Sequence, residues 1–216
     1  RRFESLPPAR AARGKSRRSP FAGPKMRHDA GMATARPNPS GDAELVLGID
    51  PGLQRTGYAV LAPAPTPREG HLVEAGVIRL RREHALTARL IELEDALTTL
   101  LSRHHPQALA CEELYAHYKH PRTAILMAHA RGVILACAAR HGLQIISIAA
   151  TNVKKLLTGN GHAGKRQVQL AVAATLHLPA IPEPSDVADA IAIALAGARL
   201  RCAASVVAKA TRRARA

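Results

Sequence analysis

Aromatic residues are almost absent from this sequence of 216 residues: they make up 2% of it, and there is no tryptophan. Hydrophobic residues nevertheless make up 47% of the chain. A core of ordinary size can therefore form, and we expect Ala, Val, Ile and Leu to build it. The length suits one domain with extensions at its ends.

Cysteine is scarce as well. The three cysteines, Cys111, Cys137 and Cys202, are odd in number and form no CxxC or other metal-binding spacing. This usage predicts a reduced, intracellular protein.

Long uncharged apolar runs are also missing. The apolar stretch around residues 187–198, which Asp189 interrupts, is too short to span a bilayer. The N-terminus is rich in arginine but has no apolar stretch of the kind found in secretory signals. Its composition fits a transit peptide, and it equally fits an upstream over-extension with Met32 as the natural start.

Acidic residues are few at both ends of the chain, where the net charge of +15 is concentrated. Residues 1–40 carry a net charge of +8 and residues 199–216 carry +6, whereas residues 41–198 carry only +1. Basic tails bearing Pro and Ser are usually disordered, so the high charge alone supports nucleic-acid binding only weakly. We expect a disordered basic extension over 1–43, a folded domain over 44–200 and a basic C-terminal tail over 201–216.

Short apolar segments and turn residues predict three strands before the first helix, within 44–50, 58–62 and 71–80. Leucines at spacings of three and four from Leu86 to Leu100 predict an amphipathic helix over 85–103. Two further strands are expected within 108–113 and 143–149, and four more helices within 121–141, 150–157, 164–178 and 184–198. This order predicts an α/β domain whose mixed five-stranded sheet has three antiparallel strands, then parallel additions, with helices on both faces.

Four carboxylates stand at conspicuous places in this pattern. Asp50 ends the first strand, Glu112 ends the fourth, and Asp186 and Asp189 begin the very apolar helix "PSDVADAIAIALAGA". Three of them have ordinary interpretations when taken singly: Asp50 as a turn residue, Glu112 as a solvated edge acid, and Asp186 as first-turn helix acidity. Asp189 is harder to dismiss, because its apolar neighbours leave it little solvated surface.

Taken together, the four acids indicate a metal site. Residues at i and i+3 of a helix lie about 5–6 Å apart on one face. If that face covers the sheet where Asp50 and Glu112 end, four negative charges converge and require cations. Oxygen ligands suit Mg²⁺ or Mn²⁺, and a pair of such ions promotes in-line displacement at phosphorus. The expected chemistry is phosphodiester hydrolysis, with Asp50 on the central strand bridging two ions.

The sequence resembles the RuvC family of bacterial Holliday junction resolvases, in the ribonuclease H-like superfamily. The resemblance runs in order from residue 45 to 200, over the stretches "LGIDPGLQRTGYAV", "ACEELY", "AHARGVILACA", "TNVKKLLTGNGHAGKRQVQ", "LHLPA" and "SDVADAIAIALA". It implies that Asp50, Glu112, Asp186 and Asp189 are the catalytic, metal-binding carboxylates. Some members carry His where this chain has Asp186.

The resemblance also implies a substrate and partners. It predicts a Mg²⁺-dependent endodeoxyribonuclease with two ions per active site, replaceable by Mn²⁺, that resolves four-way junctions in recombination and repair. Two symmetric nicks would leave 5′-phosphate and 3′-hydroxyl ends. The family further implies a homodimer, a branch-migration motor complex (RuvA and RuvB) as partner, a cytoplasmic, nucleoid-associated location, and no membrane partner.

Candidate DNA contacts flank a glycine-rich loop. Lys154, Lys155, Lys165 and Arg166 form a local basic cluster that can neutralise phosphates; such clusters are often merely solvated, but the resemblance favours Lys154 and Lys165 as DNA-binding lysines. It also matches Tyr115 to an aromatic position that packs on unstacked bases. The loop 115–122 otherwise departs from the family, and its histidines lack the further ligands of a zinc site.

The helix over 121–141 resembles the family's dimer-interface helix. Its apolar residues and its small residues would suit close packing between copies: Ile125, Val133 and Leu135, with Ala128, Ala130 and Gly132. An ordinary core helix would show the same pattern.

Three other functions compete with this interpretation. Actin-like ATPases share "G-I-D-x-G", but they need a second, similar domain, for which the sequence has no room, and a second phosphate loop, which it lacks. The chain could also be a general ribonuclease H-like nuclease that acts on RNA or other branched DNA. The remaining alternative is a non-catalytic basic DNA-binding protein, which predicts that Asp50→Asn causes no measurable change.

Overall fold

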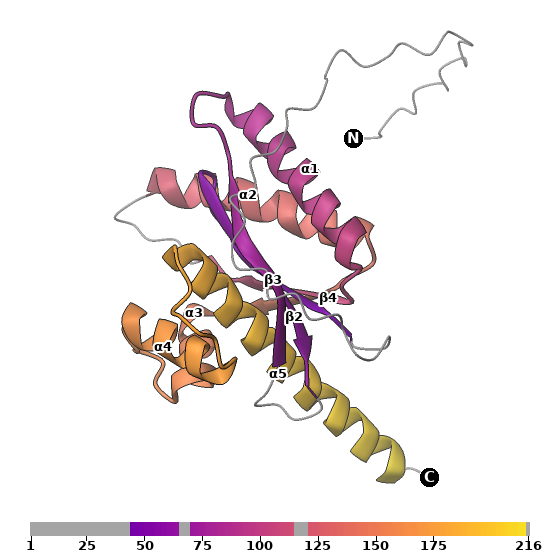
Figure 1. The fold of residues 1–216 in the computed structure, drawn as a ribbon. Coiled ribbons are helices and arrows are strands. Elements are labelled where there is room, and N and C mark those ends of the chain that lie inside the picture. The colour runs from indigo at the N-terminus through magenta and orange to yellow at the C-terminus, as the bar shows by residue number, and fades with distance from the viewer. Residues whose placement is uncertain (1–43, 65–69, 115–120, 215–216) are drawn as a thin grey trace, which may run out of the picture.

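The computed structural model describes residues 44–64, 70–114 and 121–214 (Figure 1). Five strands form one sheet in the order β3-β2-β1-β4-β5. Their bounds are β1 Val46–Asp50, β2 Arg55–Pro63, β3 Gly70–Arg79, β4 Ala108–Glu112 and β5 Gln144–Ile148. β1, β2 and β3 pair antiparallel, and β4 and β5 are parallel additions to β1. The predicted mixed sheet is confirmed, with β1 at its centre.

Helices cover both faces of the sheet, as predicted (Figure 1). Two lie on one face, α1 Leu86–His104 and α2 Pro121–Arg140, and three on the other, α3 Ala150–Thr158, α4 Lys165–Thr175 and α5 Ser185–Ala214. Successive strand residues point to opposite faces, so β1 supplies both cores: Leu47 and Ile49 pack with α1 and α2, and Val46 packs with α5. Both cores are largely aliphatic.

α5 lies unusually close to the strands beneath it. A Cβ at Gly48 would be 2.5 Å from the backbone oxygen of Ala190, and one at Gly57 would be 2.1 Å from that of Asp186. Only glycine leaves room for such contacts, and the alanines along α5 keep the helix narrow. The start of α5 is therefore fixed over β1 and β2, and its acids are fixed with it.

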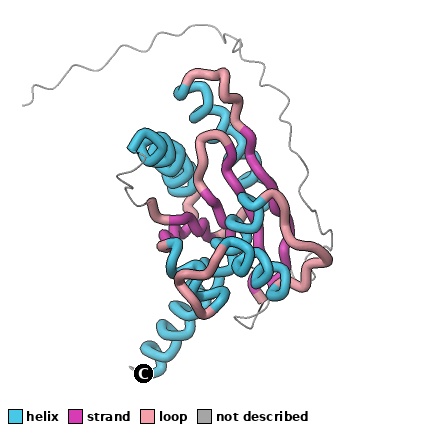
Figure 2. The backbone as a smooth tube through the Cα atoms, turned by 90° about the vertical axis from the view of Figure 1, so that its left-hand side faces the viewer, coloured by secondary structure: helices cyan, strands magenta, loops and turns pink. Residues whose placement is uncertain are grey.

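The helix predicted over 184–198 is too short, because α5 continues as one helix to Ala214, through most of the predicted basic C-terminal tail over 201–216. Figure 2 shows its end extending beyond the strands. Residues 199–214 are rich in Ala and Arg, which favour helix, and they extend a helix already nucleated in the core. The predicted extension over 1–43 lies outside the described residues.

Two helices in the described part of the chain, within α2 and α5, would be long and apolar enough to cross a membrane by length and composition alone. For α5 this composition has a structural reason. Residues 190–198 are all buried, so the helix is apolar because it forms part of the core.

Candidate active site

The sheet brings two of the predicted carboxylates together. Asp50 and Glu112 are the last residues of β1 and β4, which are parallel neighbours with Ile49 opposite Cys111. Their side chains line a pocket of about 300 Å³ that also includes Asp189 of α5. Lys154 and Lys165 complete its charged lining. Three of the four predicted acids therefore share one pocket at the carboxyl ends of parallel strands, a common place for active sites in α/β proteins.

Each acid of α5 is paired with a cation. Lys165 Nζ lies 3.3 Å from Asp189 Oδ2, and Arg55 Nε lies 3.5 Å from Asp186 Oδ2. Asp186 does not line the pocket, and its Oδ2 is buried without a hydrogen-bond partner. The two α5 acids are therefore not equivalent, and Asp189 is the better placed to act with Asp50 and Glu112.

The surroundings of the pocket disfavour the ionised form of its carboxylates. Burial raises the pKa of Asp50 to about 7, and the negative charges of Asp189, Glu112 and Asp186 add to this effect. Burial likewise raises the pKa values of Glu112 and Asp189, while Lys154 and Lys165 oppose the rise. A shift caused by burial and by like charges together is typical of a functional site and is relieved by a bound cation.

The donor set suits a hard divalent cation, since it consists of carboxylate oxygens alone. As the side chains lie, no group of three His, Cys, Asp or Glu within the described ranges is arranged closely enough to hold an ion. In this arrangement the two α5 acids are paired with Arg55 and Lys165. The like charges around Asp50 and the buried Asp186 oxygen that has no hydrogen bond both fit a site that takes up cations.

The glycine-rich loop places the basic residues beside the carboxylates. α3 is followed by Gly159, which caps the helix in a left-handed conformation with a φ of 78°, and the turn leads directly into α4. Gln167 Oε1 accepts a hydrogen bond from Gly164 N and so fixes the start of α4, where Lys165 stands. Lys155 and Arg166 are exposed nearby, outside the pocket lining. Tyr115 lies outside the described residues.

Two arginines at the site were not predicted from the sequence. Arg131 of α2 donates from Nε to the backbone oxygen of Glu112 at 3.1 Å and from Nη2 to Ser147 Oγ at 2.9 Å. It thereby ties the ends of β4 and β5 to α2. The other is Arg55, whose partner is Asp186. The quoted motif "LGIDPGLQRTGYAV" contains Arg55 but gives no sign of which element it faces.

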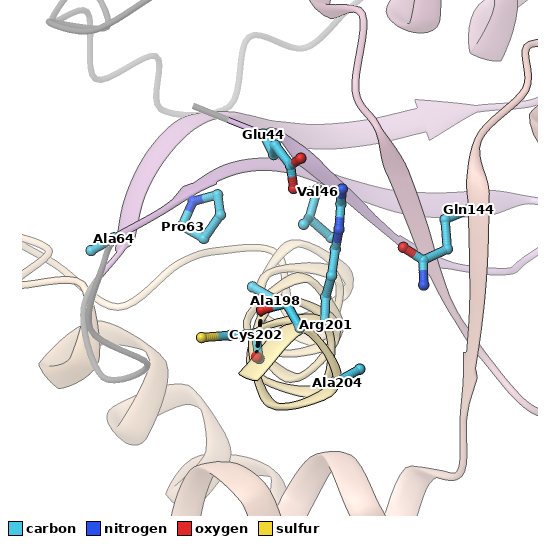
Figure 3. Close-up of a pocket in the computed structure, with 10 residues that line it drawn as sticks. Glu44, Val46, Pro63, Ala64, Gln144, Ala198, Arg201, Cys202 and Ala204 are labelled. Atoms are coloured by element: carbon cyan, nitrogen blue, oxygen red, sulfur yellow. Dashed lines mark hydrogen bonds and ion pairs between the residues drawn. The ribbon is translucent and has the colours of Figure 1, made fainter. Parts of the chain in front are cut away.

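A larger pocket, of about 480 Å³, lies at the other end of the sheet (Figure 3). Its lining includes the first residue of β1, the last of β2 and the C-terminal half of α5. Its charged residues are Glu44 and Arg201, which form an ion pair with each other. With one acid already paired, it is no candidate for a site of phosphodiester hydrolysis.

Comparison with known proteins identifies the family. The family model for the crossover junction endodeoxyribonuclease RuvC matches residues 46–197. The RuvC protein of Rhodopirellula baltica is 50% identical over 169 residues, which cover 77% of this chain and 90% of the relative. That of Chromohalobacter salexigens is 40% identical, covering 74% and 84% respectively.

Solved structures agree with the sequence relatives. The structure of RuvC from T. thermophilus in complex with a Holliday junction substrate matches with a TM-score of 0.70 and 30% identity, over 74% of this chain and 96% of that one. A yeast mitochondrial Holliday junction resolvase, Ydc2, matches with a TM-score of 0.51 at 14% identity, over 73% and 80%, and shows the shared fold alone.

Proposed function

This chain belongs to the RuvC family of crossover junction endodeoxyribonucleases, and on that premise we propose how its own residues cut a four-way DNA junction. The chain is a structure-specific nuclease of this family. The observation that carries the assignment of its site is the pocket in which Asp50, Glu112 and Asp189 meet Lys154 and Lys165. Acids that would take up metal and cations that would hold phosphate line the same small volume.

We propose that Asp50, Glu112 and Asp189 hold two Mg²⁺ ions, replaceable by Mn²⁺, with Asp186 as a further ligand. The bound ions would supply Lewis acidity at the phosphate and lower the pKa of the attacking water. Asp50 is the most central of the acids, since the other three all raise its pKa. It is therefore our candidate for the carboxylate shared by both ions, and the cut is expected to leave 5′-phosphate and 3′-hydroxyl ends.

Cleavage of a synthetic four-way junction tests this function. We expect paired, symmetric incisions in strands of like polarity, dependent on Mg²⁺, and little cutting of linear duplex of the same sequence. Equal cutting of the duplex would favour a general ribonuclease H-like nuclease. Junction binding without any incision would favour a non-catalytic DNA-binding protein.

We assign the DNA contacts to Lys154, Lys165, Lys155 and Arg166, with Tyr115 stacking on unpaired bases. Lys154 and Lys165 line the pocket itself. Because Lys165 is 58% exposed and pairs with Asp189 at 3.3 Å, it can exchange that carboxylate for a phosphate oxygen as DNA arrives. The two lysines would then hold the backbone next to the cleavage position.

Lys165→Ala is expected to weaken junction binding and to reduce its salt dependence. Each phosphate neutralised contributes about 0.9 to the slope of log K against log salt on B-DNA, so the slope should fall by about one. Titrations in Ca²⁺ at several salt concentrations measure it. Arg103→Ala, which removes an exposed arginine paired with Glu74, is the matched control. An unchanged slope for Lys165→Ala would count against this contact.

We propose that α2 forms the interface of a homodimer. One side of α2 packs on the sheet through Ala130 and Ile134, both fully buried. The other side leaves Ile125 56% and Leu126 38% exposed, and a Cβ at Gly132 would meet nothing within 4 Å. An apolar helix face with room for close approach suits a second copy, and two copies supply the two active sites that paired nicks require.

Ile125→Glu is expected to make the chain sediment as a monomer, because a charge would be buried in the proposed interface. Ile91→Glu on α1 is the matched control, since Ile91 is 59% exposed. Sedimentation velocity at micromolar concentration measures the outcome. A dimer that tolerates Ile125→Glu as well as Ile91→Glu would place the interface elsewhere.

We also propose that the chain acts in the cytoplasm on nucleoid DNA, together with the branch-migration motor complex of RuvA and RuvB. The support is membership of the family. Recovery of this chain on immobilised junction DNA, with and without the cognate motor proteins, tests the partnership. Equal recovery in both cases would contradict it.

A further inference from the structure

Two arginines face each other at the active-site end of the sheet. Arg55 is the first residue of β2 and Arg79 is the last residue of β3, and the register of the two antiparallel strands places them directly opposite. Both are exposed. Directly opposite residues point to the same face of a sheet, where like charges destabilise the pairing. Two guanidinium groups at this position therefore concentrate positive charge at this end of the sheet.

The face that they share is the face of the carboxylates. Arg55 Nε lies 3.5 Å from Asp186 Oδ2, at the start of α5. Gly57, two residues further along β2, lies directly under the backbone of Asp186 and pairs with Asp50 on β1. The arginines thus lie on the β2–β3 side of the acids.

Lys154 and Lys165 lie on the opposite side. They belong to α3 and α4, which pack on the same face of the sheet beyond α5. The carboxylates are therefore placed between two groups of cations. The phosphate backbone of one DNA strand that crosses the pocket would contact the lysines on one side of the acids and the arginines on the other.

We propose that Arg55 and Arg79 form a second phosphate-binding site for the DNA, so that the cleaved strand is held on both sides of the cleavage position. The proposal rests on the proposed function. Each DNA strand carries a phosphate about every 3.4 Å along the helix axis, so phosphates flanking the cleaved one reach both groups of cations. A planar guanidinium also suits two phosphate oxygens better than an ammonium does.

The ion pair between Arg55 and Asp186 gives this site a second consequence. In the free protein Asp186 neutralises Arg55, and the pair is partly exposed, with side-chain exposures of 49% and 21%. Pairs of this kind contribute little to stability. When a phosphate takes the place of Asp186 beside Arg55, the carboxylate is released toward the metal site. DNA binding and completion of the ligand set are thereby linked.

Salt titrations test the contact. We expect Arg55→Gln and Arg79→Gln each to weaken junction binding in Ca²⁺ and to lower the salt slope by about one. The matched control is Arg140→Gln, which removes another exposed arginine, paired with Glu94 on the α1–α2 face. We expect the control to bind like the wild-type chain. Thermal unfolding of each variant establishes that it is folded.

Junctions carrying one neutral methylphosphonate at a time locate the contact. In the wild-type chain we expect neutralising a phosphate on one side of the cleavage position to weaken binding severalfold. Arg55→Gln should be insensitive at that phosphate yet remain sensitive on the other side, and Lys165→Ala should show the reverse. If Arg55→Gln and Arg79→Gln both keep the wild-type slope and the wild-type pattern, the second site is overturned. If the wild-type chain neither binds nor cuts junctions, it is the proposed function that fails.

Discussion

Asp50→Asn is expected to bind a four-way junction in Ca²⁺ as well as the wild-type chain does, and to lose Mg²⁺-dependent nicking by roughly a thousandfold or more. The amide has almost the same shape as the carboxylate but carries no charge, so the fold and the DNA surface are retained. Metal ions supply several kcal/mol of transition-state stabilisation, and each 1.36 kcal/mol is worth about tenfold in rate. The loss is large because Asp50 interacts with all three other acids.

Asp95→Asn provides the matched control for this variant. Asp95 is exposed on α1, on the opposite face of the sheet, and its replacement changes the charge by the same amount. Single-turnover cutting at saturating protein separates binding from chemistry. Nicking by Asp50→Asn at the rate of the control would remove Asp50 from the catalytic site, and with it the interpretation of the pocket.

The metal-free protein is expected to lose stability as pH rises from about 4 to about 7. The pKa of Asp50 is about 7 in the folded protein, against an ordinary value of 3.8. Between these values the folded protein holds a proton that the unfolded chain has released, so raising the pH favours unfolding. At about 1.36 kcal/mol for each pH unit, the loss amounts to at most about 4 kcal/mol, and it is complete above pH 7.

Asp50→Asn should abolish most of this pH dependence. The variant is then expected to be the more stable of the two proteins at pH 8 in EDTA, and no more stable than the wild-type chain at pH 4. Denaturant unfolding at a series of pH values measures the difference, with Asp95→Asn expected to follow the wild-type curve. Added Mg²⁺ or Mn²⁺ should stabilise the wild-type chain at pH 8, since a ligand that binds the folded state stabilises it. If the free energy of unfolding changed with pH in the same way in Asp50→Asn and in the wild-type chain, ionisation of Asp50 would not destabilise the fold.

Much of the fold could be predicted because its signals are local. The leucine spacing from Leu86 to Leu100 identified α1, and short apolar segments ending in turns identified all five strands. The candidate site was predicted by the same reasoning: Asp50 and Glu112 end neighbouring strands, and an acid within an apolar helix needs a cation or another polar partner. These inferences need only periodicity and the cost of burying charge.

The features that were missed depend on contacts between distant segments. The sequence shows Arg55 as one basic residue in a turn, and only the register of β1, β2 and β3 places it beside Asp186 and opposite Arg79. The unequal positions of Asp186 and Asp189 follow from how α5 sits on Gly48 and Gly57, which no pattern in the helix reveals. The end of the last helix was also missed: the apolar pattern stops near residue 198, but α5 continues through the basic segment to Ala214.

Diffraction from crystals soaked in Mn²⁺ tests the central claim most directly, because the anomalous signal of the ion locates it without reference to activity. We predict a peak between Asp50, Glu112 and Asp189 in the wild-type chain, with Lys165 withdrawn from Asp189, and its loss in Asp50→Asn. A peak that persists in Asp50→Asn, or an ion bound only outside this pocket, would contradict the assignment of the carboxylates as the metal-binding catalytic site.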